Sequence, residues 1–254
     1  MSKAPVTIIT PCYNEGTTVI NFLQALEKAV VSLSRSFCVV VVYDGSTDNT
    51  SSLLQEFQFS HENVRLKVVD LKFNVGHQAA IYQGLLYVRD LQSDYFIIMD
   101  SDGEDAPSLI PELMSRMHAD IVNVVRSSRK ESVAFKLCYR IYKASFRMIT
   151  GKQMNYGNFC LISRPVLELA VASNFSHFAA FLSKQECAKE YIVAGKELRI
   201  GGKSKMSFIK HFNHAVKSFV EYGAGWNPPK HVQNPVIKTP IYEINHDRNT
   251  KVSV

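Results

Sequence analysis

The chain has 254 residues, of which 46% are hydrophobic and 20% are charged. These proportions are typical of a globular protein and exclude general disorder or a collagen-like repeat. The longest uninterrupted apolar run, Phe37–Tyr43, is far shorter than the roughly 20 residues of a membrane-spanning helix. The five cysteines form no C-x-x-C pair, which argues against a zinc site or a disulfide scaffold, so we expect a soluble protein of the reducing cytoplasm.

The net charge of +6 is concentrated near the C-terminus. Residues 187–254 contain 11 of the 29 basic and 5 of the 23 acidic residues, so the preceding 186 residues hold 18 of each. A basic C-terminal quarter predicts contact with something anionic, such as phosphates, a nucleic acid or an acidic membrane surface; the alternative is a solvated basic face. Because no nucleic-acid-binding module is recognisable, we expect no nucleic-acid partner.

Short β-branched runs alternate with helical patterns through the first half of the chain. We expect strands at Val6–Thr10, Phe37–Tyr43, Val64–Leu71, Tyr95–Met99 and Ile121–Val125, with helices at Thr17–Leu33, Thr47–Phe57, Val75–Arg89 and Pro107–Met117. This alternation predicts an α/β fold whose mostly parallel central sheet has helices on both faces. Ligands of such sheets bind at the carboxyl ends of the strands.

The second half of the chain has a less regular pattern. Phe135–Thr150 and Lys205–Tyr222 are predicted to be basic amphipathic helices, and an extended tail with a poorly ordered end is expected from Gly223 onward. We therefore expect one α/β domain over residues 1–204, followed at 205–254 by a basic amphipathic helix and the tail.

Acidic residues gather directly after the predicted strand Tyr95–Met99. Asp100, Asp102, Glu104 and Asp105 put four carboxylates within six residues. Acidic turns are common, but carboxylates this close repel one another unless a cation is present. Because carboxylate oxygens suit Mg²⁺ or Mn²⁺, which also hold substrate phosphates, the segment predicts a site for one of these ions.

Three other strand ends carry small or polar residues. In Pro11–Glu15, the proline and tyrosine are placed to frame a flat base, and the glutamate is placed to cap the next helix. Asp44–Asp48 is a turn leading into a helix, where Ser46 or Thr47 is expected to be an ordinary N-cap. In Asn74–Ala80, a small-residue loop opens a helix, and His77 is expected to be a capping or packing residue.

Taken together, these segments resemble the inverting family 2 glycosyltransferases, which have a GT-A fold, and among them most closely the polyprenyl-phosphate sugar transferases. The resemblance covers about Val6 to Phe219 and rests on six segments in the right order: Thr10–Glu15, Asp44–Asp48, Asn74–Ala80, Asp100–Pro107, the pair Arg126 and Arg129, and Gly202–Met206. Each motif is loose alone, and their order makes the resemblance specific.

The resemblance implies a role for each matching residue. Those implied to bind the nucleotide are Pro11, Tyr13, Glu15, Asp44, Gly76, Gln78 and Ser101. Those implied to hold Mg²⁺ or Mn²⁺ are Asp100, Asp102 and Glu104. Those implied to bind the acceptor or its phosphate are Arg126, Arg199, Lys203 and Ser204, and those implied to be catalytic are Asp102, Asp105, Arg129 and Lys205.

The implied reaction moves a sugar from a nucleotide sugar, first a UDP-sugar and second a GDP-sugar, to a polyprenyl phosphate at the cytoplasmic membrane face. A soluble saccharide acceptor and a non-catalytic relative are the alternatives, and the oligomeric state stays open.

Two residues depart from the family pattern: Tyr43 and Asn158 each stand where relatives usually carry aspartate. Since an amide is no general base, a hydroxyl acceptor would need another, for which Asp105 and His177 are candidates.

Overall fold

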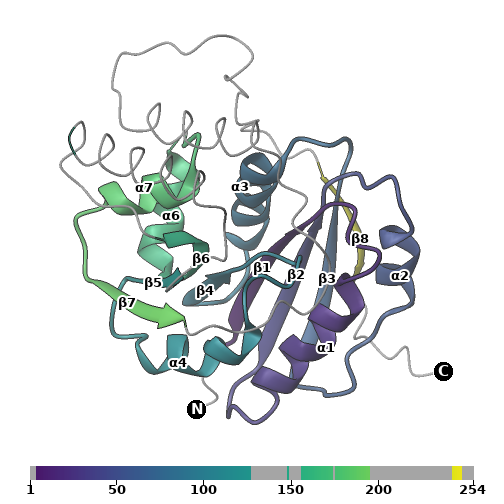
Figure 1. Cartoon of the computed structure of the whole chain (residues 1–254), viewed down its shortest axis with the longest axis horizontal. Helices are drawn as coiled ribbons and strands as arrows, with labels where there is room; N and C mark the ends of the chain where they lie inside the picture. Colours follow the sequence, from purple (N-terminus) through teal and green to yellow (C-terminus); the bar gives the residue numbers. More distant parts are fainter. Residues whose placement is uncertain (1–3, 127–147, 149–155, 174, 195–241, 248–254) are drawn as a thin grey trace, which may run out of the picture.

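The computed structural model describes residues 4–126, 148, 156–173, 175–194 and 242–247. In these residues an eight-stranded sheet has the strand order β7-β5-β6-β4-β1-β2-β3-β8 (Figure 1). The strands are β1 (Val6–Cys12), β2 (Phe37–Tyr43), β3 (Val64–Leu71), β4 (Tyr95–Ile98), β5 (Ile121–Arg126), β6 (Tyr156–Ser163), β7 (Lys189–Ala194) and β8 (Tyr242–Asp247).

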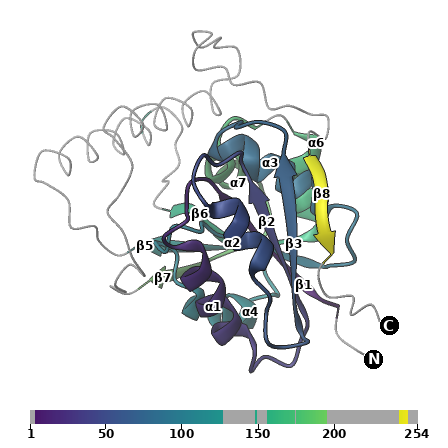
Figure 2. The ribbon, with the colours of Figure 1, turned by 90° about the vertical axis from the view of Figure 1, so that its right-hand side faces the viewer.

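Helices cover both faces of this sheet (Figure 2). They are α1 (Val19–Val30), α2 (Thr50–Glu56), α3 (His77–Val88), the 3₁₀ turn η1 (Pro107–Leu109), α4 (Ile110–Ser115), α6 (Arg164–Ala172) and α7 (Phe178–Lys184). Side chains of α3, α6 and α7 share one buried core, and those of α1, α2 and α4 share the other. Successive strand residues alternate between these cores, as Ile8 and Ile9 do in β1.

The pairing of the strands confirms the predicted α/β architecture. β1 pairs in parallel with β2 and β4, β2 with β3, and β5 with β7. β6 runs antiparallel to β4 and β5, and β8 runs antiparallel to β3. Helix α3 lies close against the sheet, since a Cβ on Gly84 would be 2.7 Å from Ile9 Cγ2 and 2.8 Å from Val42 Cγ2.

Strand β1 extends two residues beyond its predicted end, through Pro11 to Cys12. The backbone of Ile9 faces β4, because its carbonyl accepts the amide of Met99. Pro11, two residues on, faces the same side, where β4 has already ended. The amide hydrogen that proline lacks therefore has no ladder partner to lose, and the ring is tolerated inside a central strand.

Several predicted helices are shorter in the structure. The helix expected over Pro107–Met117 is interrupted, with η1 followed by α4, because Pro111 has no amide to donate and fits only in a first turn. Strands and helices from β6 to β7 were not assigned from the sequence. The two predicted amphipathic helices lie outside the described residues, except that Met148 is helical.

Strand β8 lies within the predicted C-terminal tail and forms the edge of the sheet beside β3 (Figure 1). A tail segment thus belongs to the same sheet as the N-terminal strands, while the division at residue 204 stays a prediction. Among the described residues, no helix combines the length and the apolar character needed to cross a bilayer.

Candidate functional site

The loops that follow β1 and β2 are joined by Asn14. Its backbone is in the left-handed region, with φ of 56°. The Asn14 amide donates to Ser46 Oγ (2.9 Å), and Asn14 Oδ1 accepts the amide of Thr47 (2.8 Å). Ser46 and Thr47 therefore do not cap α2, and that prediction was wrong: the N-cap position is Asn49, while Asp48 Oδ1 accepts the Thr50 amide at 3.0 Å.

The loops that follow β2 and β3 are joined by Asp44. Its two carboxylate oxygens accept the backbone amides of Val75 (2.7 Å) and Gly76 (3.0 Å), and only 2% of the residue is exposed. Burial raises the pKa of Asp44, although both amide hydrogen bonds and the nearby His77 act in the opposite direction. Asp44 thus holds the start of α3 and offers almost no surface to a ligand.

The acidic turn after β4 is braced from both sides. Asp105 Oδ2 accepts the amide of Asp100 (2.9 Å), Ser101 Oγ donates to the Pro11 carbonyl (2.9 Å), and Asp102 Oδ1 accepts the amide of Glu104 (2.9 Å). Asp105 and Ser101 are buried, whereas Asp100, Asp102 and Glu104 are partly exposed. The turn therefore presents three carboxylates at the surface and holds a fourth beneath them.

A fourth link joins the start of α3 to this turn. His77 Nε2 lies 2.8 Å from Asp100 Oδ1. Burial alone lowers the pKa of His77, but the carboxylates of Asp100, Asp105 and Asp102 outweigh it, so that the pKa is raised. The sequence did not reveal this contact, because it depends on the strand order that brings α3 across β1 and β2 toward the end of β4.

The remaining predicted nucleotide contacts differ in exposure. Tyr13 is 44% exposed after β1. The Glu15 carboxylate is buried and accepts a hydrogen bond from the Thr18 hydroxyl. Gln78 is also buried, and its Oε1 accepts the amide of Phe178 at 2.6 Å. Tyr43 stands where members of the family usually carry aspartate, and its hydroxyl donates to the Ser46 carbonyl (3.0 Å).

The basic residues predicted to bind phosphate are mostly outside the described part of the chain. Arg126 is the last residue of β5, at its carboxyl end. The other basic candidates, Arg129, Arg199, Lys203 and Lys205, fall in segments that the structure does not describe, as does Ser204. Their contribution stays a prediction.

The side chains of the two residues proposed as general bases each accept a hydrogen bond from a nearby backbone amide. Asp105 is 2% exposed and binds the Asp100 amide, as described above. His177 is the N-cap residue of α7, where its Nδ1 accepts the amide of Ala180 at 3.3 Å, and it is 8% exposed. Neither side chain is presented at the surface of the site.

Two asparagines on β5 and β6 contain buried side-chain atoms without a hydrogen-bond partner. In Asn123, which is 0% exposed, both the amide nitrogen and the oxygen are unpaired, and in Asn158 the oxygen is. An unpaired buried amide destabilises a fold by about 1–3 kcal/mol. The other residues of β5 around Asn123 are valines and an isoleucine, so this buried amide lies in an otherwise apolar stretch.

Replacing Asn123 tests this cost. Asn123→Val is expected to raise the free energy of unfolding by about 1–3 kcal/mol, since it removes an unpaired amide and suits a buried strand. Urea unfolding followed by circular dichroism measures the change. Thr10→Val, which removes another buried unpaired atom, is expected to act in the same direction. An unchanged or lower stability of Asn123→Val would mean that a buried water satisfies the amide.

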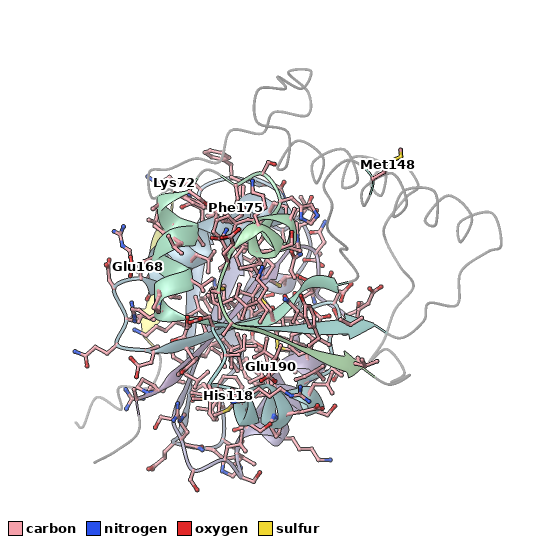
Figure 3. The ribbon with its side chains drawn as sticks, turned by 90° about the vertical axis from the view of Figure 1, so that its left-hand side faces the viewer. Lys72, His118, Met148, Glu168, Phe175 and Glu190 are labelled. Atoms are coloured by element: carbon pink, nitrogen blue, oxygen red, sulfur yellow. The ribbon has the colours of Figure 1, made fainter. Side chains whose placement is uncertain are left out.

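A separate polar cluster lies away from the acidic turn. His118 Nε2 is 2.5 Å from Glu190 Oε1, and Arg116 contacts the other oxygen of Glu190 at 3.2 Å. Figure 3 shows His118 and Glu190 in the lower half of the molecule, well below Lys72 and Phe175. The hydrogen bond from His118 lowers the pKa of Glu190, as expected for an ion pair that joins β7 to the segment before β5.

The acidic turn suits a divalent cation whose coordination is completed by the phosphates of a substrate. Within the described ranges, no three histidine, cysteine or acidic side chains converge closely enough to enclose a metal ion by themselves. Mg²⁺ and Mn²⁺ at phosphate sites use one or two carboxylates, and phosphates and waters supply the other ligands. Asp100 and Asp102, on one turn with both side chains partly exposed, match that donor set.

The fold defines the class of protein first. Glucosyl-3-phosphoglycerate synthase from Mycobacterium tuberculosis aligns over 86% of this chain and 80% of its own, with a TM-score of 0.60 and 16% identity. The crystal structure of that protein with Mn²⁺, UDP-glucose and phosphoglyceric acid aligns with a TM-score of 0.58 at 15% identity, over 86% of this chain and 78% of the other. The chain therefore has the predicted GT-A-like fold.

The family follows from the sequence comparison. The model of glycosyl transferase family 2 matches residues 7–175, so the chain belongs to this family, and the predicted enzyme class is confirmed at the level of family. Undecaprenyl-phosphate 4-deoxy-4-formamido-L-arabinose transferase of Pseudomonas paraeruginosa is 31% identical over 82% of this chain and 62% of its own length. An uncharacterized glycosyltransferase of Bacillus subtilis, YkcC, is 26% identical over 80% and 64%. The chain spans 46–64% of the curated relatives it matches.

Proposed function

We propose that the protein transfers a sugar from a nucleotide sugar to a polyprenyl phosphate, with inversion at the anomeric carbon and with Mg²⁺ or Mn²⁺ bound. Family membership supports sugar transfer. The lipid acceptor is supported by the name of the P. paraeruginosa relative and by the chemistry of the candidate bases. The donor proposed first is a UDP-sugar, in keeping with the UDP-glucose bound by the M. tuberculosis synthase, and second a GDP-sugar.

The burial of the two candidate bases is the observation that carries the choice of acceptor. A sugar hydroxyl needs a general base to remove its proton during attack, whereas a phosphate oxygen is already an anion. Asp105 and His177 are both buried and both accept backbone amides. An acceptor that needs no base fits this arrangement better than a saccharide hydroxyl does.

Each exposed residue of the site has a proposed part in transfer. Asp100 and Asp102 would hold the cation, with Glu104 as a third candidate ligand, and the bound cation would neutralise the departing nucleoside diphosphate. Tyr13 offers an aromatic face to the base. Asp44 and Ser101 keep the loops around these groups in place through backbone contacts.

The basic C-terminal quarter has a proposed part as well. Its 11 basic residues would bring the domain to the anionic membrane surface, where a polyprenyl phosphate is available. Flotation with vesicles that contain anionic lipid is expected to carry the protein at low salt and to release it at high salt. A protein that never floats would contradict membrane contact.

The transfer assay tests the function directly. Thermal-shift screening with UDP-, GDP-, CDP- and dTDP-sugars, with Mn²⁺ or Mg²⁺, identifies the donor, because a ligand that binds the folded state raises Tm. The labelled donor is then offered undecaprenyl phosphate in detergent, or a soluble saccharide. Label in the lipid fraction is the expected result. Label only in the saccharide would overturn the lipid acceptor, and no transfer with any donor would support a non-catalytic relative.

A further inference from the structure

A chain of hydrogen bonds connects the acidic turn to helix α7 through the first two residues of α3. His77 Nε2 contacts Asp100 Oδ1 at 2.8 Å, and Gln78 Nε2 lies 3.3 Å from His77 Nδ1. On its other side, Gln78 Oε1 accepts the amide of Phe178, the first residue of α7, at 2.6 Å. Gln78 is 6% exposed, so its contact with the Phe178 amide is shielded from water, whereas the side chains of His77 and Asp100 are partly exposed.

The amide of Phe178 determines which way Gln78 faces. A backbone N–H can only donate, so the atom 2.6 Å from it must be the oxygen of the glutamine amide. The NH₂ group of Gln78 then points at His77 Nδ1, which must accept a hydrogen bond. The proton of the neutral imidazole is therefore on Nε2, and it is donated to Asp100.

The anchor at Phe178 is held rigidly. The ring of Phe175 lies 5.6 Å from that of Tyr82 on α3 and 5.4 Å from that of Phe178, measured between centroids. The Tyr82 hydroxyl also donates to the Val171 carbonyl at 3.0 Å. Val171 belongs to α6 and Phe175 to the segment that joins α6 to α7, so α3 contacts this connection, which places the Phe178 amide near Gln78.

We propose that Gln78 is a positioning residue, which acts through His77 to hold the Asp100 carboxylate in the orientation that binds the cation. This inference rests on the proposed function, because it concerns the cation of that reaction. It gives Gln78 a role that needs no contact with the nucleotide. Residues that orient a metal ligand through hydrogen bonds commonly change metal affinity about 10–100-fold when they are replaced.

A double-mutant cycle on Mn²⁺ affinity tests the proposal. Free Mn²⁺ is titrated by electron paramagnetic resonance against the full chain, with and without UDP, for the wild type, His77→Ala, Gln78→Met and the double variant. We expect Gln78→Met to weaken Mn²⁺ binding about tenfold. If Gln78 acts through His77, the double variant binds Mn²⁺ no more weakly than His77→Ala does.

Gln83→Met is the matched control, because Gln83 is a second buried glutamine of α3, five residues further along. It is expected to change Mn²⁺ affinity less than twofold. Effects of His77→Ala and Gln78→Met that simply add, or an equal loss in Gln83→Met, would overturn the positioning role. Those two outcomes would leave the metal-dependent function standing. A wild type that binds no Mn²⁺, even with UDP, would instead overturn both the metal-dependent function and this inference.

Discussion

Asp102→Asn is expected to reduce kcat/KM for sugar transfer about 100- to 1000-fold, which is the usual loss when one electrostatic contact to a developing charge is removed. The amide side chain cannot supply the negative charge that a divalent cation requires. It can still accept the Glu104 amide through its Oδ1, as the carboxylate does at 2.9 Å, so the turn should keep its shape. Initial rates measured over a range of Mn²⁺ concentrations report both the loss and any increase in the metal requirement.

Glu62→Gln is a suitable control for that experiment. Glu62 is an exposed carboxylate just before β3, at the amino end of the strand, so its loss changes the net charge by the same amount far from the site. We expect full activity from Glu62→Gln and an unchanged urea midpoint from both variants. Asp102→Asn with near wild-type transfer would show that the acidic turn does not serve the reaction, and the metal-dependent proposal would then be wrong.

The strands of the first half could be predicted because buried parallel strands are continuous apolar runs. Phe37–Tyr43 and Val64–Leu71 were predicted with the bounds that the structure has. Helix starts were less predictable, because side chains from other loops compete for them. The pattern indicates that α2 begins at Thr47, but the Thr47 amide is hydrogen-bonded to Asn14 on another loop and the helix begins three residues later, at Thr50. This competition between loops distant in sequence leaves no local signal.

The candidate site shows the same division between local and long-range information. The acidic turn was predictable, because Asp100 and Asp102 follow an apolar strand directly. The partners of the other motif residues were not, since each contact joins loops on different strands. Asp44 accepts the amide of Gly76 in the next loop, and Gln78 accepts the amide of Phe178 in α7, 100 residues further along. Motif residues that resemble ligand contacts can therefore be braces that hold the ligand-binding loops.

Asp44→Ala tests the bracing role and is expected to lower the free energy of unfolding by about 2–5 kcal/mol. Two backbone amides, those of Val75 and Gly76, would lose their acceptor, and each buried unpaired group costs about 1–3 kcal/mol. Urea unfolding measures the loss, and thermal shift with the donor measures nucleotide binding. Asp44→Asn, which keeps one acceptor oxygen, should fall between Asp44→Ala and the wild type. An Asp44→Ala variant of wild-type stability would contradict a brace.

The pH dependence of Asp44→Asn separates the charge of this carboxylate from its hydrogen bonds. Because burial raises the pKa of Asp44 above its ordinary 3.8, the folded protein binds the proton more tightly than the unfolded chain does. The contribution of this group to stability is then full below pH 3.8 and declines as pH rises through the folded-state pKa. The wild type should therefore gain stability relative to Asp44→Asn on acidification. An opposite trend in urea unfolding would mean that the two amide hydrogen bonds outweigh the cost of burying the charge.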